Sequence, residues 1–272
     1  NWVKKELENA EADMLPAEPE TDSDAKDVEQ SLRKKFRKSI WCKFTKAINE
    51  YELVKPGDKI AVCISGGKDS MLMAKLLQEL QLHGKVKFDL VFLVMNPGYN
   101  EDNWNIILNN AKLLGIPINV FESDIFNIVA DVDKSPCYLC ARMRRGYLYS
   151  HAKELGCNKI ALGHNKDDVV ETFFMSLLYE GRLNCFAPVS FLDRKKLYSI
   201  RPLMYVPEWE CRSFVNKSDI HIVKNPCLAD GNTKRQETKE LLAELSLRYD
   251  NLQEKVFGAI KRSSLKGWNH EE

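Results

Sequence analysis

"AVCISGGKDSMLMAKLL", residues 61–77, joins the end of an apolar run to a glycine turn and then to a helical pattern. The apolar run, residues 59–64, suits a buried strand, and the apolar residues after the turn have the spacing of a helix. A glycine turn between a strand and a helix lets backbone N–H groups approach an anion at the positive end of the helix. The stretch therefore predicts an anion-binding loop at SGGKDS, residues 65–70, with a spacing that is neither GxxxxGK[ST] nor GxGxxG.

Strand-like and helix-like segments alternate after this loop. Further strand-like runs lie at 88–96, 118–123, 158–165 and 196–203, and helical patterns lie at 71–84, 101–116, 144–156, 167–181 and 208–219. This alternation predicts an α/β fold with a parallel sheet and helices on both faces. Ligands of such sheets bind beyond the carboxyl ends of the strands.

The segment "GHNKDD" follows the fourth predicted strand and is expected at that same edge. Gly163 allows a close approach of the backbone, while His164, Asp167 and Asp168 offer acid–base or magnesium chemistry. For His164, the alternative is a hydrogen-bonded structural histidine.

Composition divides the chain into four parts. Residues 1–30 are acidic and offer little to bury, so we expect poor order there. A basic amphipathic helix is expected at 31–52, the α/β domain at 53–235, and a C-terminal helical segment, broken near Asp250, at 236–272.

The basic segment at 33–46 holds seven basic residues and no acid. Apolar residues recur there every four positions and predict one buried stripe: Phe36, Ile40, Phe44 and Ile48. The opposite face is either an ordinary solvated surface or a surface that meets RNA. In the second case the binding residues are Lys34, Lys35, Arg37 and Lys38.

The composition of the 272 residues is that of an ordinary globular protein with a net charge of +1. No apolar run reaches the roughly 18 residues that span a membrane, and no signal-peptide pattern opens the chain, so we expect no membrane contact. Eight cysteines in a chain of this length favour a reducing cytoplasm, where CxxC pairs serve metals or catalysis more often than structure.

One CxxC pair, Cys137 and Cys140, precedes the third predicted helix and is expected on the ligand side of the sheet. It has three interpretations: two ligands of a metal centre, a redox dithiol, or a structural turn. The other cysteines stand singly. Cys63 is expected to be buried in the first strand, and Cys42, Cys157 and Cys211 are interpreted as packing residues. Cys185 has no assigned role, and Cys227 follows a proline in a late loop.

These motifs together resemble one known family. SGGKDS is identified as the PP-loop of the ATP pyrophosphatase superfamily, whose members split ATP between the α and β phosphates. The order of CISGGKDS, CYLCARMRRGYLY, KIALGHNKDD, IRPLMYV and a late PC is similar to that of the tRNA 2-thiocytidine synthetase family, over about residues 31–237. Two features depart from it: the late cysteine stands in CLADG rather than in a second CxxC, and the acidic N-terminal extension has no counterpart.

The resemblance implies roles for individual residues. Pyrophosphate would be bound by Ser65, Gly66, Gly67 and Ser70, with charge from Lys68 and magnesium at Asp69. Met95, at the end of the second strand, would meet the adenosine. Cys137, Cys140 and Cys227 would hold a [4Fe-4S] cluster with one open iron. Arginine forks suit phosphate, so Arg142, Arg144 and Arg145, and also Arg201, are candidates for contacts with RNA; the alternative is ordinary surface or structural ion pairs.

The function that the resemblance implies is ATP-dependent tRNA sulfur transfer. The O2 atom of a tRNA cytidine attacks the α phosphate of ATP, and sulfur then replaces the adenylated oxygen. Expected partners are tRNA and a sulfur donor, either a cysteine desulfurase or sulfide, and a homodimer is compatible with this function. The alternatives are the same chemistry on a uridine, an ATP-independent desulfidase, and a non-enzymatic iron–sulfur module that binds RNA or acts as a sensor.

Overall fold

The structure is a computed structural model that describes residues 22–123, 125, 136–223 and 233–268. Its strands form one six-stranded sheet in the order β3-β2-β1-β4-β6-β5. Their bounds are β1 (Lys59–Ile64), β2 (Asp89–Asn96), β3 (Ile118–Glu122), β4 (Lys159–Ala161), β5 (Val189–Leu192) and β6 (Leu197–Ile200). All neighbours pair in parallel except β5 and β6. The predicted α/β fold with a parallel sheet is confirmed.

The antiparallel edge strand β5 has no counterpart among the predicted strands. It forms a hairpin with β6 through a short charged turn, in which Lys196 adopts a φ of 50°. Its four residues are too few for a period-of-two pattern to stand out from a loop. The hairpin thus adds an antiparallel edge to an otherwise parallel sheet.

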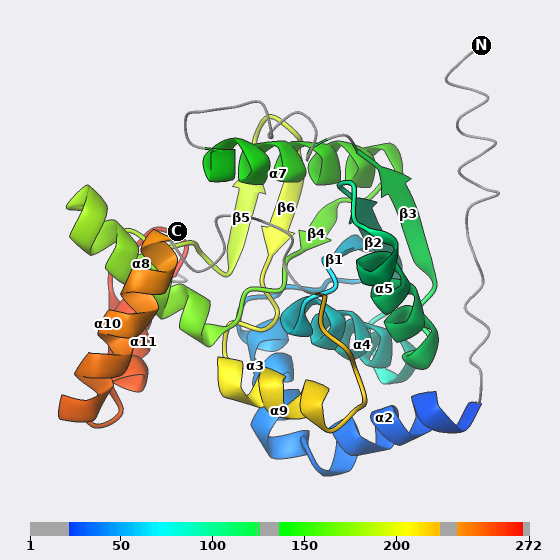
Figure 1. Cartoon of the computed structure of the whole chain (residues 1–272), viewed down its shortest axis with the longest axis horizontal. Helices are drawn as coiled ribbons and strands as arrows, with labels where there is room; N and C mark the ends of the chain where they lie inside the picture. Colours follow the sequence, from blue (N-terminus) through cyan, green and yellow to red (C-terminus); the bar gives the residue numbers. More distant parts are fainter. Residues whose placement is uncertain (1–21, 124, 126–135, 224–232, 269–272) are drawn as a thin grey trace.

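The helices surround this sheet in Figure 1. They are α2 (Asp22–Lys34), the π-helix η1 (Arg37–Trp41), α3 (Cys42–Glu50), α4 (Lys68–His83), α5 (Glu101–Leu113), α7 (Pro136–Glu154), α8 (Lys166–Glu180), α9 (Glu208–Asn216), α10 (Lys234–Arg248) and α11 (Leu252–Arg262). Helix α7 crosses one face of the sheet, while α3, α4 and α9 lie on the other side (Figure 1). Within the described residues no helix is long and apolar enough to cross a membrane.

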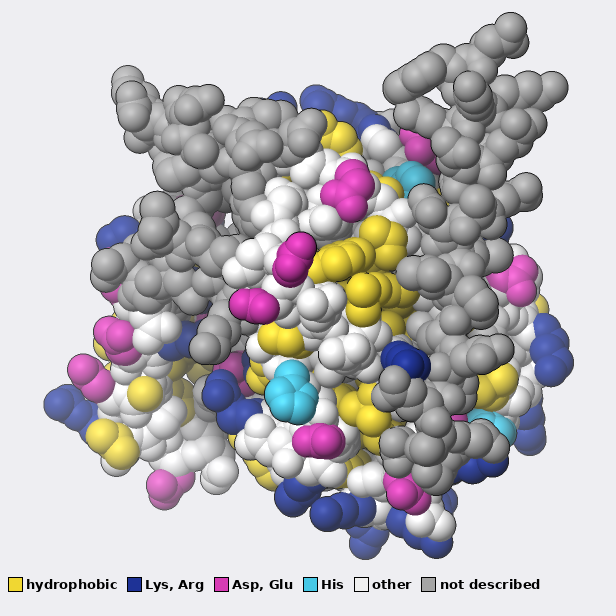
Figure 2. Space-filling model, turned by 45° about the vertical axis from the view of Figure 1, so that its right-hand side comes forward, with side chains coloured by type: hydrophobic (Ala, Val, Ile, Leu, Met, Phe, Trp, Pro, Cys, Tyr) yellow, Lys and Arg dark blue, Asp and Glu magenta, His cyan; other side chains and the backbone are white. Residues whose placement is uncertain are grey.

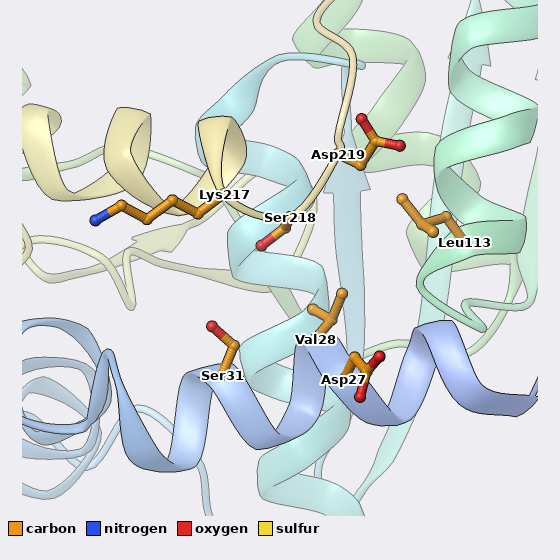
Figure 3. A pocket seen from close by; sticks show the side chains of 7 residues that line it. All are labelled: Asp27, Val28, Ser31, Leu113, Lys217, Ser218 and Asp219. Carbon is orange, nitrogen blue, oxygen red and sulfur yellow. The ribbon is translucent and has the colours of Figure 1, made fainter.

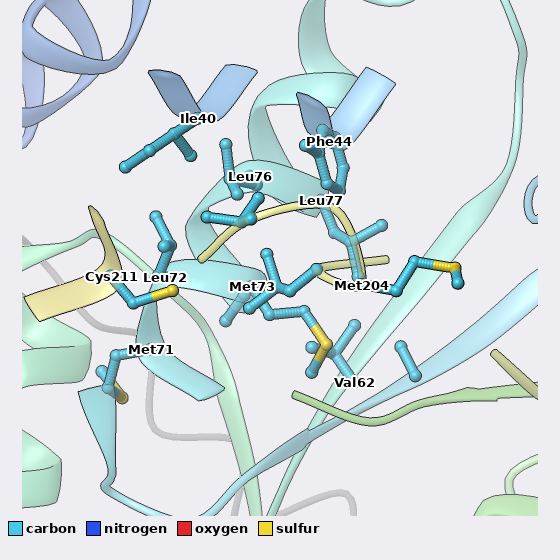
Figure 4. Close-up of a cluster of buried hydrophobic side chains, with 14 of the residues drawn as sticks. Ile40, Phe44, Val62, Met71, Leu72, Met73, Leu76, Leu77, Met204 and Cys211 are labelled. Atoms are coloured by element: carbon cyan, nitrogen blue, oxygen red, sulfur yellow. The ribbon is translucent and has the colours of Figure 1, made fainter. Parts of the chain in front are cut away.

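Alternation along β1 explains the two layers. Ile60, Val62 and Ile64 pack into the large core beneath α4, whereas Ala61 and Cys63 face the smaller core under α7. Figure 4 shows part of the large core, where Leu72, Met73, Leu76 and Leu77 of α4 meet side chains from several other elements. A strand buried on both faces reads as a continuous apolar run, which is why β1 was predictable.

The N-terminal part is more ordered than its composition predicts. Residues 22–30 belong to α2, so the expectation of poor order fails for them; residues 1–21 lie outside the described ranges. Ion pairs fasten α2 to α4: Lys75 Nζ lies 2.9 Å from Glu29 Oε1, and Arg33 Nη2 lies 2.7 Å from Glu79 Oε2. The acidic and basic residues of this segment therefore serve helix packing as well as solubility.

The basic segment spans the end of α2, the π-helix η1 and the start of α3 rather than one helix. The predicted apolar stripe is confirmed, because Phe36, Ile40, Phe44 and Ile48 are all buried. The chain changes from α2 through η1 to α3 within this stretch, which keeps the stripe on α4 and α9.

The predicted break in the C-terminal helix is confirmed. Helices α10 and α11 are separated at Asn251, which adopts a φ of 55°. Both pack against α8 and form a helical group beside the sheet (Figure 1). This position brings α10 to the carboxyl edge of the sheet, next to the loop that follows β4.

Candidate active site

The strand order places the two predicted motifs together. From β1 the chain moves outward to β2 and β3, and then crosses by α7 to β4 on the other side of β1. The order therefore reverses between β1 and β4, and in open α/β sheets ligands bind at the carboxyl ends of the strands at such a point. SGGKDS follows β1 and GHNKDD follows β4, so both line this crevice.

The glycine loop leaves the start of α4 open to an anion. Gly66 has a φ of +76°, and a Cβ there would lie 2.4 Å from Val223 Cγ2, so both the conformation and the space require glycine. Gly67 is the N-cap of α4 and supplies no side-chain hydrogen bond to the first turn. Ser70 Oγ instead lies 3.1 Å from the Ser65 nitrogen and fixes the shape of the loop. The first N–H groups of α4 therefore have no side-chain cap, which is the arrangement that the predicted anion site requires.

The loop after β4 packs directly on that helix start. A Cβ on Gly163 would lie 3.1 Å from the Ser70 nitrogen, a tight contact with the backbone of α4 that glycine avoids. Asn165 closes the N-terminus of α8 with a capping box that includes Asp168. Its Nδ2 atom also donates to Asp69 Oδ1 at 3.1 Å. Of these two helix starts, α8 is thus capped and α4 is not.

Charged side chains of alternating sign join the phosphate loop to three helices. Lys68 Nζ lies 2.8 Å from Asp69 and 2.9 Å from Glu208. Arg235 Nη1 lies 3.0 Å from Asp168 and 2.9 Å from Glu171. Lys239 pairs with both Glu171 and Glu208. The closed ring, in order, consists of Asp69, Lys68, Glu208, Lys239, Glu171, Arg235, Asp168 and Asn165.

Burial and these partners shift the pKa values of the ring. Burial alone would raise the pKa of Glu208, but the ammonium groups of Lys68 and Lys239 outweigh it and lower the pKa to about 2. Burial raises the pKa of Glu171 to about 7, against the pull of its cationic neighbours. Burial also raises the pKa of Asp168. The ring therefore contains one firmly ionised carboxylate and one carboxyl group that titrates near neutrality.

The predicted catalytic residues have different surroundings. Asp69 lies in the loop itself, whereas Asp167 accepts a hydrogen bond of 2.6 Å from the Glu208 backbone at the start of α9. His164 stacks on Phe186, with ring centroids 4.9 Å apart, and its Nδ1 atom is buried without a hydrogen-bond partner. Burial, assisted by nearby arginines, lowers the pKa of His164 to about 3. His164 is therefore a neutral imidazole at physiological pH.

Met95 is buried at the carboxyl end of β2. This is the edge to which the ATP-binding prediction assigned it. Asp69, Met95, Gly163 and His164 thus lie at one edge of the sheet.

The CxxC pair lies in a helix rather than before one. Helix α7 begins at Pro136, eight residues earlier than the predicted helix, so Cys137 and Cys140 belong to its first turns. Because α7 leads from the end of β3 to the start of β4, its N-terminus lies at the same edge as the phosphate loop. Cys227 lies outside the described residues.

The single cysteines mostly serve the core. Cys63, Cys157, Cys185 and Cys211 are buried, which supports the packing interpretation for Cys157 and Cys211 and places Cys185 there too. Cys42 is exposed, so its interpretation as a packing residue is wrong. Within the part of the chain that the structure describes, no group of three His, Cys, Asp or Glu residues is arranged to hold a metal.

The two predicted RNA-binding groups lie on opposite faces of the sheet. Lys34, Lys35, Arg37 and Lys38 are exposed beside the α4 layer, and basic side chains gather along the lower rim in Figure 2. Arg142 and Arg145 are exposed on α7 over the other face, and Arg144 is half-buried there. The structure therefore does not bring the two groups into one rim.

A pocket of about 290 Å³ lies between α2, the end of α5 and the loop after α9 (Figure 3). Helix α5 runs back from the end of β2 to the start of β3, so Leu113 marks the amino edge of the sheet. This pocket is therefore remote from the crevice that holds the two motifs.

Sequence reasoning missed several members of the charged ring. Asn165 had a usable signal, because Asn followed three residues later by Asp before an apolar run is a capping pattern. Glu208, Arg235 and Lys239 had none, since their role depends on how α9 and α10 pack beside the loop.

Comparisons with known proteins show the family to which this chain belongs. The family model of the PP-loop domain matches residues 36–245. The tRNA-cytidine(32) 2-sulfurtransferase of Cellvibrio japonicus is 37% identical over 84% of this chain and 76% of the relative. That of Dechloromonas aromatica is 37% identical over 84% of this chain and 80% of the relative. In fold, the chain is similar to the U34-tRNA thiolase NcsA from Methanococcus maripaludis, solved with its [4Fe-4S] cluster, with a TM-score of 0.65, 24% identity, and coverage of 81% of this chain and 76% of that one. The chain belongs to the PP-loop family and, within it, to the tRNA-cytidine(32) 2-sulfurtransferases.

Proposed function

We propose that this protein replaces the oxygen at C2 of a tRNA cytidine with sulfur, at the expense of ATP. One observation carries the proposal: the uncapped start of α4, within SGGKDS, lies at the same edge of the sheet as the start of α7, which contains the CxxC pair. An anion site and a pair of soft ligands at one edge suit a reaction that first activates an oxygen and then replaces it.

The phosphate loop would bind ATP through backbone amides. The N–H groups at the start of α4 face the phosphates, and Lys68 adds a positive charge. Lys68 is held by Asp69 and Glu208, and these carboxylates raise its pKa against the effect of burial, so it stays charged. The O2 atom of the base attacks the α phosphate, the bond to the β phosphate breaks, and pyrophosphate leaves. The loop stabilises the charge that gathers on the leaving group.

Asp69 fits a magnesium ion by its chemistry. Magnesium takes one or two carboxylates together with phosphate oxygens and water. Asp69 lies in the loop, and its Oδ1 atom is oriented by Asn165. We propose that the ion is held between this carboxylate and the phosphates of ATP.

The cysteines fit an iron–sulfur cluster by their chemistry, because thiolates are soft ligands that suit iron. Cys63, Cys157, Cys185 and Cys211 are buried in the body of the fold, and the exposed Cys42 begins α3 on the other side of the sheet from α7. The family resemblance implies the CxxC pair and Cys227 as the ligands. Cys137, Cys140 and Cys227 would hold such a cluster, and with three protein ligands it would supply an open iron for sulfide. Replacement of the adenylated oxygen by sulfur at C2 releases AMP. The chain contributes the two ligand positions at the start of α7, at the edge where ATP would bind.

The proposed partners are tRNA and a donor of sulfide, such as a cysteine desulfurase. Because the substrate is tRNA, we propose the cytoplasm as the compartment. The arginines of α7 support an RNA surface on the cysteine side, since Arg142 and Arg145 are exposed.

The nucleotide products test this function. Wild-type protein incubated with ATP, magnesium, sulfide and unmodified tRNA should release AMP and pyrophosphate. Asp69→Asn should reduce AMP formation by about a hundredfold or more, because the proposed magnesium contact is lost while the side chain keeps its shape. The matched control is Asp193→Asn in the exposed β5–β6 turn, which should keep full activity. Release of ADP and phosphate would contradict the proposal.

A further inference from the structure

Arg201 lies at a point where a ligand is expected. It follows β6 directly, at the carboxyl edge of the sheet, and the neighbouring Leu162 nitrogen donates to the Ile200 carbonyl. Arg201 is buried, with only 9% of the residue exposed. Its guanidinium lies over the ring of Phe186, with the guanidinium carbon 4.8 Å from the ring centroid. His164 stacks on the same ring.

The other buried cations of the described residues each have a carboxylate partner. Lys75 pairs with Glu29 at 2.9 Å, Lys159 pairs with Asp58 at 2.7 Å, and Lys166 pairs with Glu254. A buried charge is tolerated in a protein when an opposite charge and hydrogen bonds compensate its lost hydration. These three lysines follow that rule.

Arg201 does not follow it. Its Nη1 atom donates to the Ala187 carbonyl and to Ser190 Oγ, but no carboxylate within the described ranges pairs with it. Its Nε–H is buried without a partner. Two neutral acceptors compensate only part of a guanidinium charge, so an anion is missing from this position.

A second arginine near Arg201 adds to the positive charge that has no negative partner. Arg145 on α7 and Arg201 both lie close enough to act on Tyr149 and on His164. Arg145 has no ion pair among the described residues, and His164 Nδ1 is buried without a partner. Burial lowers the pKa of Arg201, and burial together with nearby arginines lowers that of His164, as expected for a poorly hydrated, positively charged site.

We propose that Arg201, Arg145 and His164 form a phosphate-binding site on the α7 side of the sheet, beyond the ends of β4 and β6. A phosphate offers several acceptor oxygens and a full negative charge, which match an arginine fork and an imidazole N–H. His164 donates from Nδ1 in the matching neutral tautomer.

This inference rests on the proposed function for the source of the phosphate. Two sources have the same chemistry: a backbone phosphodiester of tRNA next to the target base, and the α phosphate of ATP. The first would hold the base near the cysteines of α7, and the second would hold AMP after pyrophosphate has left.

Binding measurements on the full chain test the site and separate its two sources. Arg201→Met should weaken the affinity for unmodified tRNA or for ATP by tenfold to a hundredfold, roughly the effect of one hydrogen-bonded charge contact. Arg201→Lys should recover only part of it, since an ammonium cannot make the fork. Loss confined to tRNA assigns the RNA backbone, and loss confined to ATP assigns the nucleotide. The matched control is Lys159→Met, a buried cation at the opposite edge of the sheet, which should lower stability and leave both affinities unchanged in the folded protein.

Inorganic phosphate supplies a readout that needs no catalysis. It should raise the melting temperature of the wild type and should raise that of Arg145→Met less. Arg145 is exposed, so this variant is expected to fold even if Arg201→Met does not. Unchanged tRNA and ATP affinities in folded Arg201→Met, or in Arg145→Met where Arg201→Met fails to fold, would overturn the phosphate site. Because these affinities are measured without turnover, such a result would leave AMP formation, and with it the proposed function, standing.

Discussion

His164 shows what a single residue's sequence context reveals and what it conceals. The GHNKDD motif placed it at the end of the fourth strand, and the structure puts it there. Its neutral state was not predictable, because that state depends on burial and on Arg201, Arg235 and Arg145, which come from other parts of the chain. The same holds for Glu208, whose low pKa depends on Lys68 and Lys239.

His164 should make the protein less stable in acid. Its pKa is about 3 in the folded protein and 6.5 as the ordinary value, so the unfolded chain binds the proton more readily. The stability that this depressed pKa supplies is complete above pH 6.5 and is lost as the pH falls toward 3, by up to about 1.4 kcal/mol per pH unit. Urea unfolding at a series of pH values should therefore show a shallower loss of stability for His164→Gln than for the wild type. Equal slopes for the two proteins would show that the pKa of His164 is the same in the folded and the unfolded chain, which contradicts the depressed value.

Secondary-structure elements were predictable where the apolar pattern is long and locally complete. The strands around 59–64 and 88–96 and the helix after the phosphate loop agree with β1, β2 and α4. The errors fall where tertiary contacts decide. The edge strand β5 is stabilised by its pairing with β6, α2 is ordered by packing on α4, and α7 extends back through the cysteine pair. The last error changed the expected site most, since it moves Cys137 and Cys140 from a loop into the first turns of a helix.

The proposed cluster predicts which cysteines hold iron. Anaerobically prepared protein should contain about four irons and four sulfides per chain, as expected for one [4Fe-4S] cluster. Cys137→Ala, Cys140→Ala and Cys227→Ala should each lose most of this iron. Cys157→Ala is the matched control, because Cys157 is buried in the small core under α7. This variant should lower the stability of the protein and leave its iron content unchanged. Cys211 is a poorer control, since its thiol contacts Asp69. A wild type that carries one zinc instead, or a Cys227→Ala variant with full iron content, would contradict the three-cysteine site.

At the scale of the whole molecule, the order of the strands brings the phosphate loop and the CxxC pair to one edge of the sheet. The reversal between β1 and β4 gathers the phosphate loop, the β4 loop and the start of α7 at one edge, although about 70 residues separate SGGKDS from the CxxC pair. The charged ring then ties this edge to α10, which follows the segment that contains Cys227. The nearness of the two motifs could be expected from the fold class alone, whereas the ring could not, because it depends on the packing of helices outside the sheet.

The central claim is that one edge of the sheet activates a cytidine with ATP and replaces its oxygen with sulfur. The most direct measurement determines AMP and thiolated nucleosides in the same reaction, by chromatography and by mass spectrometry of the digested tRNA. Wild-type protein should form 2-thiocytidine with at least one AMP for each thiolated base. Asp69→Asn should lose both products, whereas Cys140→Ala should lose 2-thiocytidine and keep its affinity for ATP, since the phosphates bind to a separate loop. Thiolation that proceeds without ATP, sulfur found on a uridine in place of cytidine, or undiminished thiolation by Cys140→Ala would contradict the account.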